Sequence, residues 1–437
     1  MCSALCVFLG LGGMLFIRMP IFYTVAIGAM IVLTISLLLT LTLLPALLFM
    51  MGNRIQSEMR INSGSHQIKT SLWTYLSAAV MKRPVKVGLL ASLILFWFIL
   101  PLGQMNLAIP DASSLSKAYE SRQAAELFDQ YFTDPSTSQV FVMMEGEAHA
   151  LQVEDWMGAY QIHEQLEKDP QVIQVDSVFS KIELTAEEWR RLAQSPILKE
   201  QFKAAITPFI QGNKLLMSIT LRGHENSKVA RDWVRDWERI LLDKRALIGG
   251  EPKYQQEVYD EIFTNMDKVL LFIFISNFIV LLIAFRSILI PIKTIIMNLM
   301  SLGASFGILV WIFKEGHLGM EPSSIAIMIP VFIFGLTFGI SMDYGVFLLS
   351  RIYEIYRKTG DNELSVKVGL ALTSKMITSA ATIMIVVTAP FALGTVVGVK
   401  QLGIGIAAAI LIDATIIRMM LVPSLMKLLG RWNWWGP

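Results

Sequence analysis

The chain has 437 residues, of which 54% are apolar and 16% are charged, and its formal net charge is +2. A soluble domain of ordinary composition carries about a quarter of its residues as charged side chains. In this chain the charges are missing in blocks. That distribution indicates segments that cross a lipid bilayer, and it argues against an apolar soluble core.

Long apolar stretches define the candidate membrane spans. A helix needs roughly 20 mostly apolar residues to cross a bilayer. Eight stretches are candidates, and the first of them is short and lies at the start of the chain. They are residues 3–16, 21–50, 85–102, 269–285, 288–313, 325–350, 377–393 and 402–425.

One long segment, residues 104–266, differs in character from the rest. It carries 26 acidic and 17 basic residues, a net charge of −9, whereas the remainder has 20 basic and 9 acidic residues, a net charge of +11. Cytoplasmic loops of membrane proteins are enriched in Lys and Arg. Outside this segment the basic residues cluster between the second and third spans, between the sixth and seventh spans, and after the eighth span. These three places lie on the same side of the membrane if every stretch crosses it once. We therefore expect the acidic segment to be extracytoplasmic.

The acidic segment is predicted to fold as an α/β or α+β domain. Short runs of β-type residues alternate with helix-like segments, a pattern typical of such domains. The predicted strands are 138–144, 172–178 and 215–221, and the predicted helices are 118–132, 153–169, 186–194 and 228–242. Gly249 and Gly250 are expected to interrupt the chain before the fourth span.

Several kinds of site find no support in the sequence. Cys2 and Cys6 lie in the first apolar stretch, so no disulfides are expected in the acidic domain. No phosphate-binding G-x-x-x-x-G-K-[ST] run is present. The histidines are scattered through polar segments and lack metal-ligand spacing, so we interpret them as surface residues; they are His66, His149, His163, His224 and His317. We expect no metal site, no cofactor, no nucleic-acid partner and no enzymatic activity.

An internal repeat links the two ends of the chain. Pro45 and Gly52 lie seven residues apart after a long apolar helix, as do Pro423 and Gly430. Residues 1–54 therefore read as a second copy of about 377–432, and such repeats are typical of transporters built from two halves. We expect the chain to lack most of an N-terminal half. The predicted organisation is 1–54, the last two helices of a first repeat; 55–83, a cytoplasmic linker; 84–104, a transmembrane helix; 105–265, the extracytoplasmic domain; and 266–430, a five-helix transmembrane region.

The sixth span contains an acidic residue where few are tolerated. Asp343 and Tyr344 lie inside apolar sequence, and Arg351 follows eight residues later. At 1.5 Å per residue the carboxylate lies about 12 Å inside the cytoplasmic end. An ionised group at that depth costs about 2.5–3.5 kcal/mol on insertion scales, and such residues mark ion or proton pathways. Asp343 is predicted to be a proton or ion relay; the alternative is a structural hydrogen bond to a neighbouring helix.

Gly335 and Gly339 precede Asp343 on the same helix face, where small residues allow a neighbouring helix to approach closely. Tyr344 is expected to hydrogen-bond across that helix contact or to pack there.

The last span carries a second acid. Asp413 is interpreted as a further member of the relay or as a tie between helices. Arg418 lies five residues later, about 140° around an α-helix, so it is not expected to pair with Asp413 and is expected to extend toward the cytoplasmic face. Asn298 and Ser301 in the fifth span are expected to make helix-packing hydrogen bonds.

Three motifs together resemble one family. GISMDYGVFLLSRIYE, TSKMITSAATIM and GIGIAAAILIDATIIRMMLVPSLMKLLG look like the C-terminal membrane half of the MMPL family, part of the resistance-nodulation-division (RND) superfamily, and IGGEPKYQQEVYDEI resembles the end of its extracytoplasmic porter domain. Members have twelve spans in two halves, each with one external domain. The resemblance implies export of lipids or other hydrophobic compounds, driven by protons that pass an Asp-Tyr pair in each half. Asp343 and Tyr344 match the second pair, and Asp413 matches the acid of the final helix.

In that frame the chain begins in the fifth span, and the first external domain, four spans and the first Asp-Tyr pair are absent. The expected protein is a multi-pass component of a bacterial cell membrane: an all-α transmembrane bundle of about eight helices with one α+β extracytoplasmic porter-like domain. Its expected partners are membrane lipids, a hydrophobic substrate, and a second copy in a homodimer or a separately encoded N-terminal half. The alternatives are a Patched-like lipid-binding or sensing module and a non-transporting membrane scaffold.

Overall fold

The computed structural model describes residues 2–55, 80–132, 134, 136–182 and 184–435. They form two compact units. The first consists of Met1–Ser116 with Thr264–Pro437, and the second of Lys117–Phe263. Most of the linker predicted at 55–83 lies outside the described residues.

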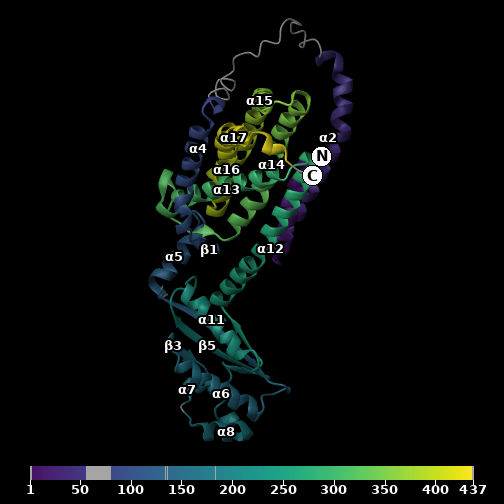
Figure 1. Ribbon diagram of the computed structural model, residues 1–437. Helices are drawn as coiled ribbons and strands as arrows, with labels where there is room; N and C mark the ends of the chain where they lie inside the picture. Colours follow the sequence, from purple (N-terminus) through teal and green to yellow (C-terminus); the bar gives the residue numbers. More distant parts are fainter. Residues whose placement is uncertain (1, 56–79, 133, 135, 183, 436–437) are drawn as a thin grey trace. The chain divides into compact units, whose positions relative to one another are not determined.

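The first unit is a helical bundle (Figure 1). Seven of the described helices are long and apolar enough to cross a membrane, and Ala4–Phe16 forms a shorter apolar helix. The predicted bundle of about eight helices is therefore confirmed. Its helices are α1 (Cys2–Gly13), η1 (Met14–Phe16), α2 (Pro20–Ile55), α4 (Pro84–Ile99), η3 (Leu100–Gln104), η4 (Ala112–Ser114), α13 (Leu289–Glu315), η5 (His317–Gly319), α14 (Met328–Thr359), α15 (Asn362–Thr388), η6 (Ala389–Leu393), α16 (Val397–Ile412), η7 (Asp413–Leu421), α17 (Val422–Leu429) and η8 (Gly430–Trp434), with α12 (Glu251–Phe285) entering from the second unit.

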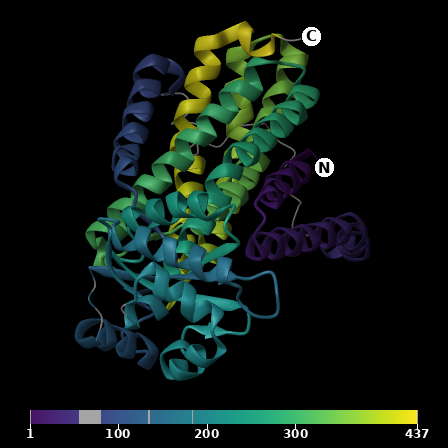
Figure 2. The same ribbon diagram turned by 90° about the horizontal axis from the view of Figure 1, so that it is seen from below.

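The helices differ in how far the bundle covers them. In α14 and in the final span, 67% and 61% of the most apolar window is buried, so both lie in the centre of the bundle. In α2 that fraction is 0%, and both views place α2 at the edge of the bundle (Figures 1 and 2). A helix that is apolar all round and this exposed requires lipid or further protein around it.

The glycine face of α14 is covered by α1. A Cβ added to Gly10 would lie 2.9 Å from the carbonyl oxygen of Gly335, and one added to Gly339 would lie 2.8 Å from the Cα of Val7. The two backbones therefore touch, as small residues at membrane helix contacts allow. The close helix neighbour expected at Gly335 and Gly339 is α1 of the same chain.

The first unit also has a short parallel strand pair, β1 (Leu107–Ala108) with β7 (Ile325–Ala326). The buried side chain of Gln401 fixes this region: its Oε1 accepts a hydrogen bond from the Ala326 amide at 2.9 Å, and its Nε2 donates one to the Ser324 carbonyl at 2.8 Å. The loop between α13 and α14 is thus tied to α16.

The second unit combines helices with one antiparallel sheet, which confirms the predicted α+β domain. The strand order is β3-β5-β2-β6, and β4 pairs with β5. The strands are β2 (Thr137–Glu145), β3 (Val172–Asp176), β4 (Ile210–Gln211), β5 (Lys214–Arg222) and β6 (Ala246–Gly249). The helices are α5 (Glu120–Phe132), α6 (Val153–Glu167), α7 (Val178–Lys181), α8 (Ala186–Gln194), α9 (Pro196–Gln201), α10 (Lys203–Ile206) and α11 (Lys228–Leu241).

Side chains on one face of the sheet build the core of the second unit. Along β2, Val140 and Val142 are buried while Phe141 and Met143 between them are exposed, as strand alternation requires. Trp156 of α6 stacks on Trp189 of α8 within this core. The interpretation of the histidines as surface residues is wrong for one of them.

His163 of α6 is 4% exposed. Its Nδ1 lies 3.3 Å from the Ser177 hydroxyl and its Nε2 lies 3.3 Å from a carboxylate oxygen of Glu167. Burial lowers the pKa of the His163 imidazole below its ordinary value, because desolvation penalises the charged form. His66 lies outside the described residues.

Candidate proton-relay site

The two acids predicted for the relay lie on elements that pack together in the centre of the bundle. α14 is continuous through Asp343 and Tyr344, both of which are half-buried. Asp413 begins η7 and is 2% exposed. Within the described residues, no group of three or more His, Cys, Asp or Glu side chains is arranged to hold a metal ion.

η7 is a π-helix of nine residues inserted between two α-helices of the final span. Such segments are rare and occur often at functional sites. In a π-helix, hydrogen bonds join residues five apart, so the side chains of residues i and i+5 lie near one another. The predicted α-helical geometry placed Asp413 and Arg418 on different faces of the helix. The observed π-helix places both side chains on the same face.

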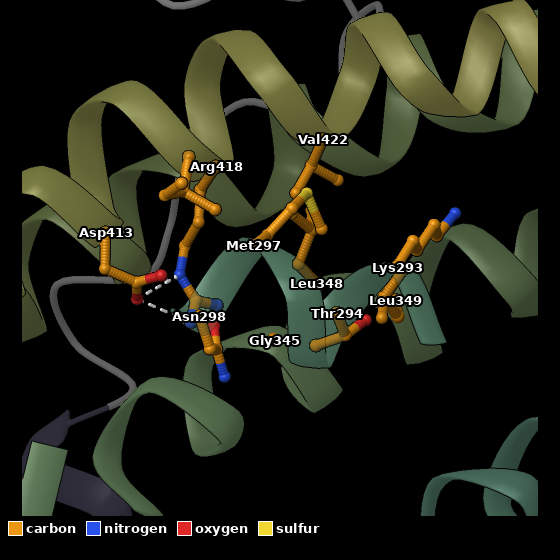
Figure 3. A pocket seen from close by; sticks show the side chains of 11 residues that line it. Lys293, Thr294, Met297, Asn298, Gly345, Leu348, Leu349, Asp413, Arg418 and Val422 are labelled. Carbon is orange, nitrogen blue, oxygen red and sulfur yellow. Dashed lines mark hydrogen bonds and ion pairs between the residues drawn. The ribbon is translucent and has the colours of Figure 1, made fainter. Parts of the chain in front are cut away.

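Asp413 and Arg418 form a buried ion pair (Figure 3). The Nε and an Nη of Arg418 lie 2.8 Å and 2.7 Å from the same carboxylate oxygen of Asp413. Their side chains are only 4% and 3% exposed. The expectation that Arg418 extends toward the membrane surface is therefore wrong.

Arg418 also joins η7 to α14. One guanidinium nitrogen donates a hydrogen bond to the Ser341 carbonyl, and the guanidinium carbon lies 5.3 Å from the centre of the Tyr344 ring. A cation over an aromatic face at this distance is stabilised by the ring quadrupole. The structure thus brings Asp413 and Tyr344 together through Arg418, a residue that the sequence interpretation had assigned elsewhere.

The neighbouring polar residues of α13 make the helix-packing bonds that we expected. The Ser341 hydroxyl donates to Asn298 Oδ1 at 2.9 Å, and the Ser301 hydroxyl donates to the Ala409 carbonyl at 3.3 Å. These bonds tie α13 to α14 and to α16.

A small cavity adjoins the ion pair (Figure 3). It offers about 20 Å³ of space and is lined by Lys293, Thr294, Met297, Asn298, Gly345, Leu348, Leu349, Asp413, Ile417, Arg418 and Val422. Lys293 was missed by sequence reasoning. The signal was available, because a lysine inside the predicted span 288–313 is as unusual as an acid there.

The ion pair leaves part of the Asp413 carboxylate unpaired. Arg418 holds the Asp413 carboxylate on its own helix and, on α14, the Ser341 carbonyl and the face of the Tyr344 ring. One oxygen of Asp413, Oδ1, has no hydrogen-bond partner among the described residues. It is therefore free to accept a hydrogen bond from solvent.

Comparisons with known proteins agree with this architecture. The family model described as "MMPL family" matches residues 1–87 and 113–437. The "Mycolic acid-containing lipids exporter MmpL11" of Mycolicibacterium smegmatis is 28% identical over 100% of this chain and 44% of its own length. The "Trehalose monomycolate exporter MmpL3" of Mycobacterium tuberculosis is 28% identical over 88% of this chain and 39% of its own length.

Among solved structures, the hedgehog release protein Disp from the water bear Hypsibius dujardini has a TM-score of 0.70 at 12% identity, covering 98% of this chain and 58% of that one. This likeness shows the fold alone. The chain spans less than half the length of the two relatives named above. With its seven candidate spans it is a multi-pass protein of the bacterial cell membrane, and it belongs to the MMPL family of the RND superfamily.

Proposed function

We propose that the chain is part of a proton-driven exporter of lipids or other hydrophobic compounds. The relatives whose printed names describe lipid exporters support the substrate class. The observation that carries the mechanism is the buried ion pair of Asp413 and Arg418 beside Tyr344. Charged groups at this depth are costly to a membrane protein and are kept for ion or proton pathways.

In this mechanism Asp343, Tyr344 and Asp413 form the proton relay. Protonation of Asp413 weakens its attraction to Arg418, and the freed guanidinium strengthens its contacts with α14. Proton uptake is thereby coupled to a movement of η7 against α14. The energy source is the proton gradient, and no cofactor takes part.

We further propose that transport requires a partner half. α2 is exposed along its apolar length and Asp343 is only half-buried, so both present surfaces that a further set of helices would cover. The partner is a separately encoded N-terminal half or a second copy of this chain. In a closed twofold dimer the same surface would serve on both copies, and the contact would lie outside the face of Gly339 that α1 covers.

The first prediction tests the relay. Asp343→Asn in the complete two-half transporter is expected to abolish proton-coupled export and leave expression and folding nearly intact, because neutralising an acid in a membrane removes its insertion cost. Export of a fluorescent lipid from proteoliposomes with an imposed pH gradient measures the effect. Tyr344→Phe removes only the hydroxyl and is expected to cause partial loss.

Glu354→Gln, on an exposed part of the same helix, is the matched control and is expected to transport normally. Undiminished export by Asp343→Asn would remove Asp343 from the relay. It would favour a Patched-like lipid-binding or sensing module, or a membrane scaffold, because neither needs a proton at this position.

A further inference from the structure

The C-terminal segment folds back onto the bundle at the end where α13 begins. Asn433 in η8 is 0% exposed. Its backbone carbonyl accepts a hydrogen bond from the Ser287 hydroxyl at 2.7 Å, and the Trp435 carbonyl accepts one from the Ile288 amide at 3.1 Å. The segment is therefore fixed against the N-terminus of α13.

Trp434 anchors the same segment to two more helices. Its ring stacks on Tyr356 of α14 at 4.6 Å between centroids, and its indole nitrogen donates to Asn362 Oδ1 of α15 at 3.0 Å. A half-buried Trp ring that stacks on a neighbour and has its N–H satisfied gives a large apolar contact that is also directional. Residues 430–435 thus form a strap across the ends of α13, α14 and α15.

The strap holds a buried lysine. Lys293 of α13 is 7% exposed, and its Nζ donates to Asn433 Oδ1 at 2.7 Å. The structure shows no carboxylate within ion-pair distance of this amine among the described residues; its partner is a neutral amide. Figure 3 shows the amine pointing away from Asp413 and Arg418, so the hydrocarbon stem of Lys293 forms the wall of the cavity at this end.

At the opposite end the cavity is polar. Asn298 Nδ2, Asp413 Oδ1 and a guanidinium nitrogen of Arg418 have no hydrogen-bond partner within the described parts of the chain, although these residues are at most 3% exposed. Buried polar groups of this kind are normally satisfied by protein or ordered water. A space of about 20 Å³ has room for about one water molecule, which needs two to four polar partners. Among the described residues that line the cavity, the charged side chains are Lys293, Asp413 and Arg418.

We propose that this cavity is a water-binding station next to Asp413, and that Lys293, held by Asn433 of the strap, is the gate between the station and the cytoplasm. While the amine is bound to Asn433, the stem of Lys293 closes the cavity. When that bond breaks, the stem moves and solvent reaches the station. The gate is inferred from the contacts of Lys293 with Asn433 and with the cavity, and its use in proton transfer rests on the proposed function.

A structural role for Lys293 makes different predictions. If the lysine only fixed the strap, its removal would loosen residues 430–435 and leave the cavity closed. The two roles are distinguished by the accessibility of the cavity wall, which does not depend on transport or on the orientation of the chain in the membrane.

The test is cysteine accessibility in unsealed membranes, with Cys2 and Cys6 replaced by alanine. Thr294→Cys places a thiol of nearly unchanged size on the cavity wall, where Thr294 is 5% exposed. Ser305→Cys, on the same helix and 0% exposed, is the control for an intact bundle. Lys367→Cys on the exposed surface of α15 is the control for reagent activity. The probe is a small charged methanethiosulfonate.

With the gate intact, Thr294→Cys is expected to react far more slowly than Lys367→Cys. Lys293→Met and Asn433→Ala are each expected to raise the rate at Thr294→Cys by about tenfold or more, because each removes one hydrogen bond to a charged group. The rates at Ser305→Cys and Lys367→Cys stay unchanged. Lys293→Met keeps the hydrogen bonds that Asn433 Nδ2 donates to Met426 and Gly430, so it tests the amine without unseating the strap.

Three results would overturn the proposal. The first is fast labelling of Thr294→Cys in the parent, since the cavity would then be open. The second is no increase in either variant. The third is a labelling rate at Thr294→Cys that rises with Asn433→Ala but not with Lys293→Met. The strap, and not Lys293, would then be what closes the cavity. An Asp413→Asn variant is tested for transport in parallel. If it loses transport although the accessibility results contradict the gate, the proposed function is retained and only the gate is abandoned.

Discussion

At the scale of single residues, the main feature of the site is an ion pair in which each buried charge is stabilised by the other. Arg418 and Asp413 are almost fully buried. Taking two charges out of water costs several kcal/mol per ion, and only good geometry with further hydrogen bonds offsets this cost. The bond from Arg418 to the Ser341 carbonyl and its contact with Tyr344 supply part of that offset.

The second prediction follows from this dependence. Arg418→Met leaves Asp413 buried without its partner and is expected to destabilise the bundle by about 3–5 kcal/mol. Adding Asp413→Asn removes the second charge and is expected to restore most of that loss. The apparent melting temperature of the purified chain in detergent measures both. Lys358→Met, which breaks the exposed pair with Glu354, is the control and should leave the melting temperature nearly unchanged, because exposed ion pairs contribute little to stability.

A double variant as unstable as Arg418→Met alone would show that the loss comes from packing of the long side chain and not from the unpaired charge. The design separates the two contributions because Met retains much of the apolar stem of arginine.

Sequence reasoning found the acids of this site but not their partners. Asp343 and Asp413 stand out because acids are rare in apolar spans. Arg418 was assigned a different role because the geometry of an α-helix was assumed. No residue pattern in DATIIRMML predicts a π-helix. Lys293 was passed over although a lysine inside a span is as unusual as an acid. Its partner, Asn433, lies 140 residues away in the chain, so no local pattern indicated the contact.

At the scale of helices, the contact between α1 and α14 explains why glycines precede Asp343. Gly10 lies against Gly335 so closely that a Cβ on Gly10 would meet the Gly335 carbonyl oxygen at 2.9 Å. The spacing of Gly335 and Gly339 predicted a close helix neighbour. It could not reveal that the neighbour is α1 from the start of the same chain, since any helix with small residues would fit.

The third prediction tests this helix contact. A Cβ at Gly339 would lie 3.4 Å from the Cβ of Val7, just under the separation found in disulfides. It would also lie 2.8 Å from the Cα of Val7, so α1 has to shift slightly to admit it. Val7→Cys with Gly339→Cys, in a background without Cys2 and Cys6, is therefore expected to form an intramolecular disulfide under mild oxidation. Gly339→Cys alone is expected to give no dimer. Gly28→Cys on α2, where an added Cβ would meet no atom within 4 Å, is the exposed control.

The readout is migration on a non-reducing gel, followed by mass analysis of peptides. A covalent dimer from Gly339→Cys alone would mean that α1 leaves this face in the membrane. A second copy of the chain would then occupy it.

At the scale of the whole molecule, the chain separates its charges between two units. The strands and helices of the acidic segment were predictable because alternation and amphipathic periodicity are local signals, and β2, β3 and β5 appear where they were expected. β4 and β6 were not predicted. They are two and four residues long, too short for a periodic pattern, and they form by pairing with strands that already exist.

The last prediction concerns orientation. The net charge of −9 on residues 104–266 and +11 on the remainder predicts that the second unit is extracytoplasmic.

Ser138, a natural first choice for a reporter cysteine, is buried at 5% exposure, and Ser63 in the predicted inner linker lies outside the described residues. Ala148→Cys and Lys367→Cys are exposed replacements for the two sides. In intact cells a membrane-impermeant maleimide is expected to label Ala148→Cys and to reach Lys367→Cys only after permeabilisation. The opposite pattern would reverse the orientation, and with it the assignment of the Lys293 gate to the cytoplasmic side, because α13 begins at the same end of the bundle as the loop between α14 and α15.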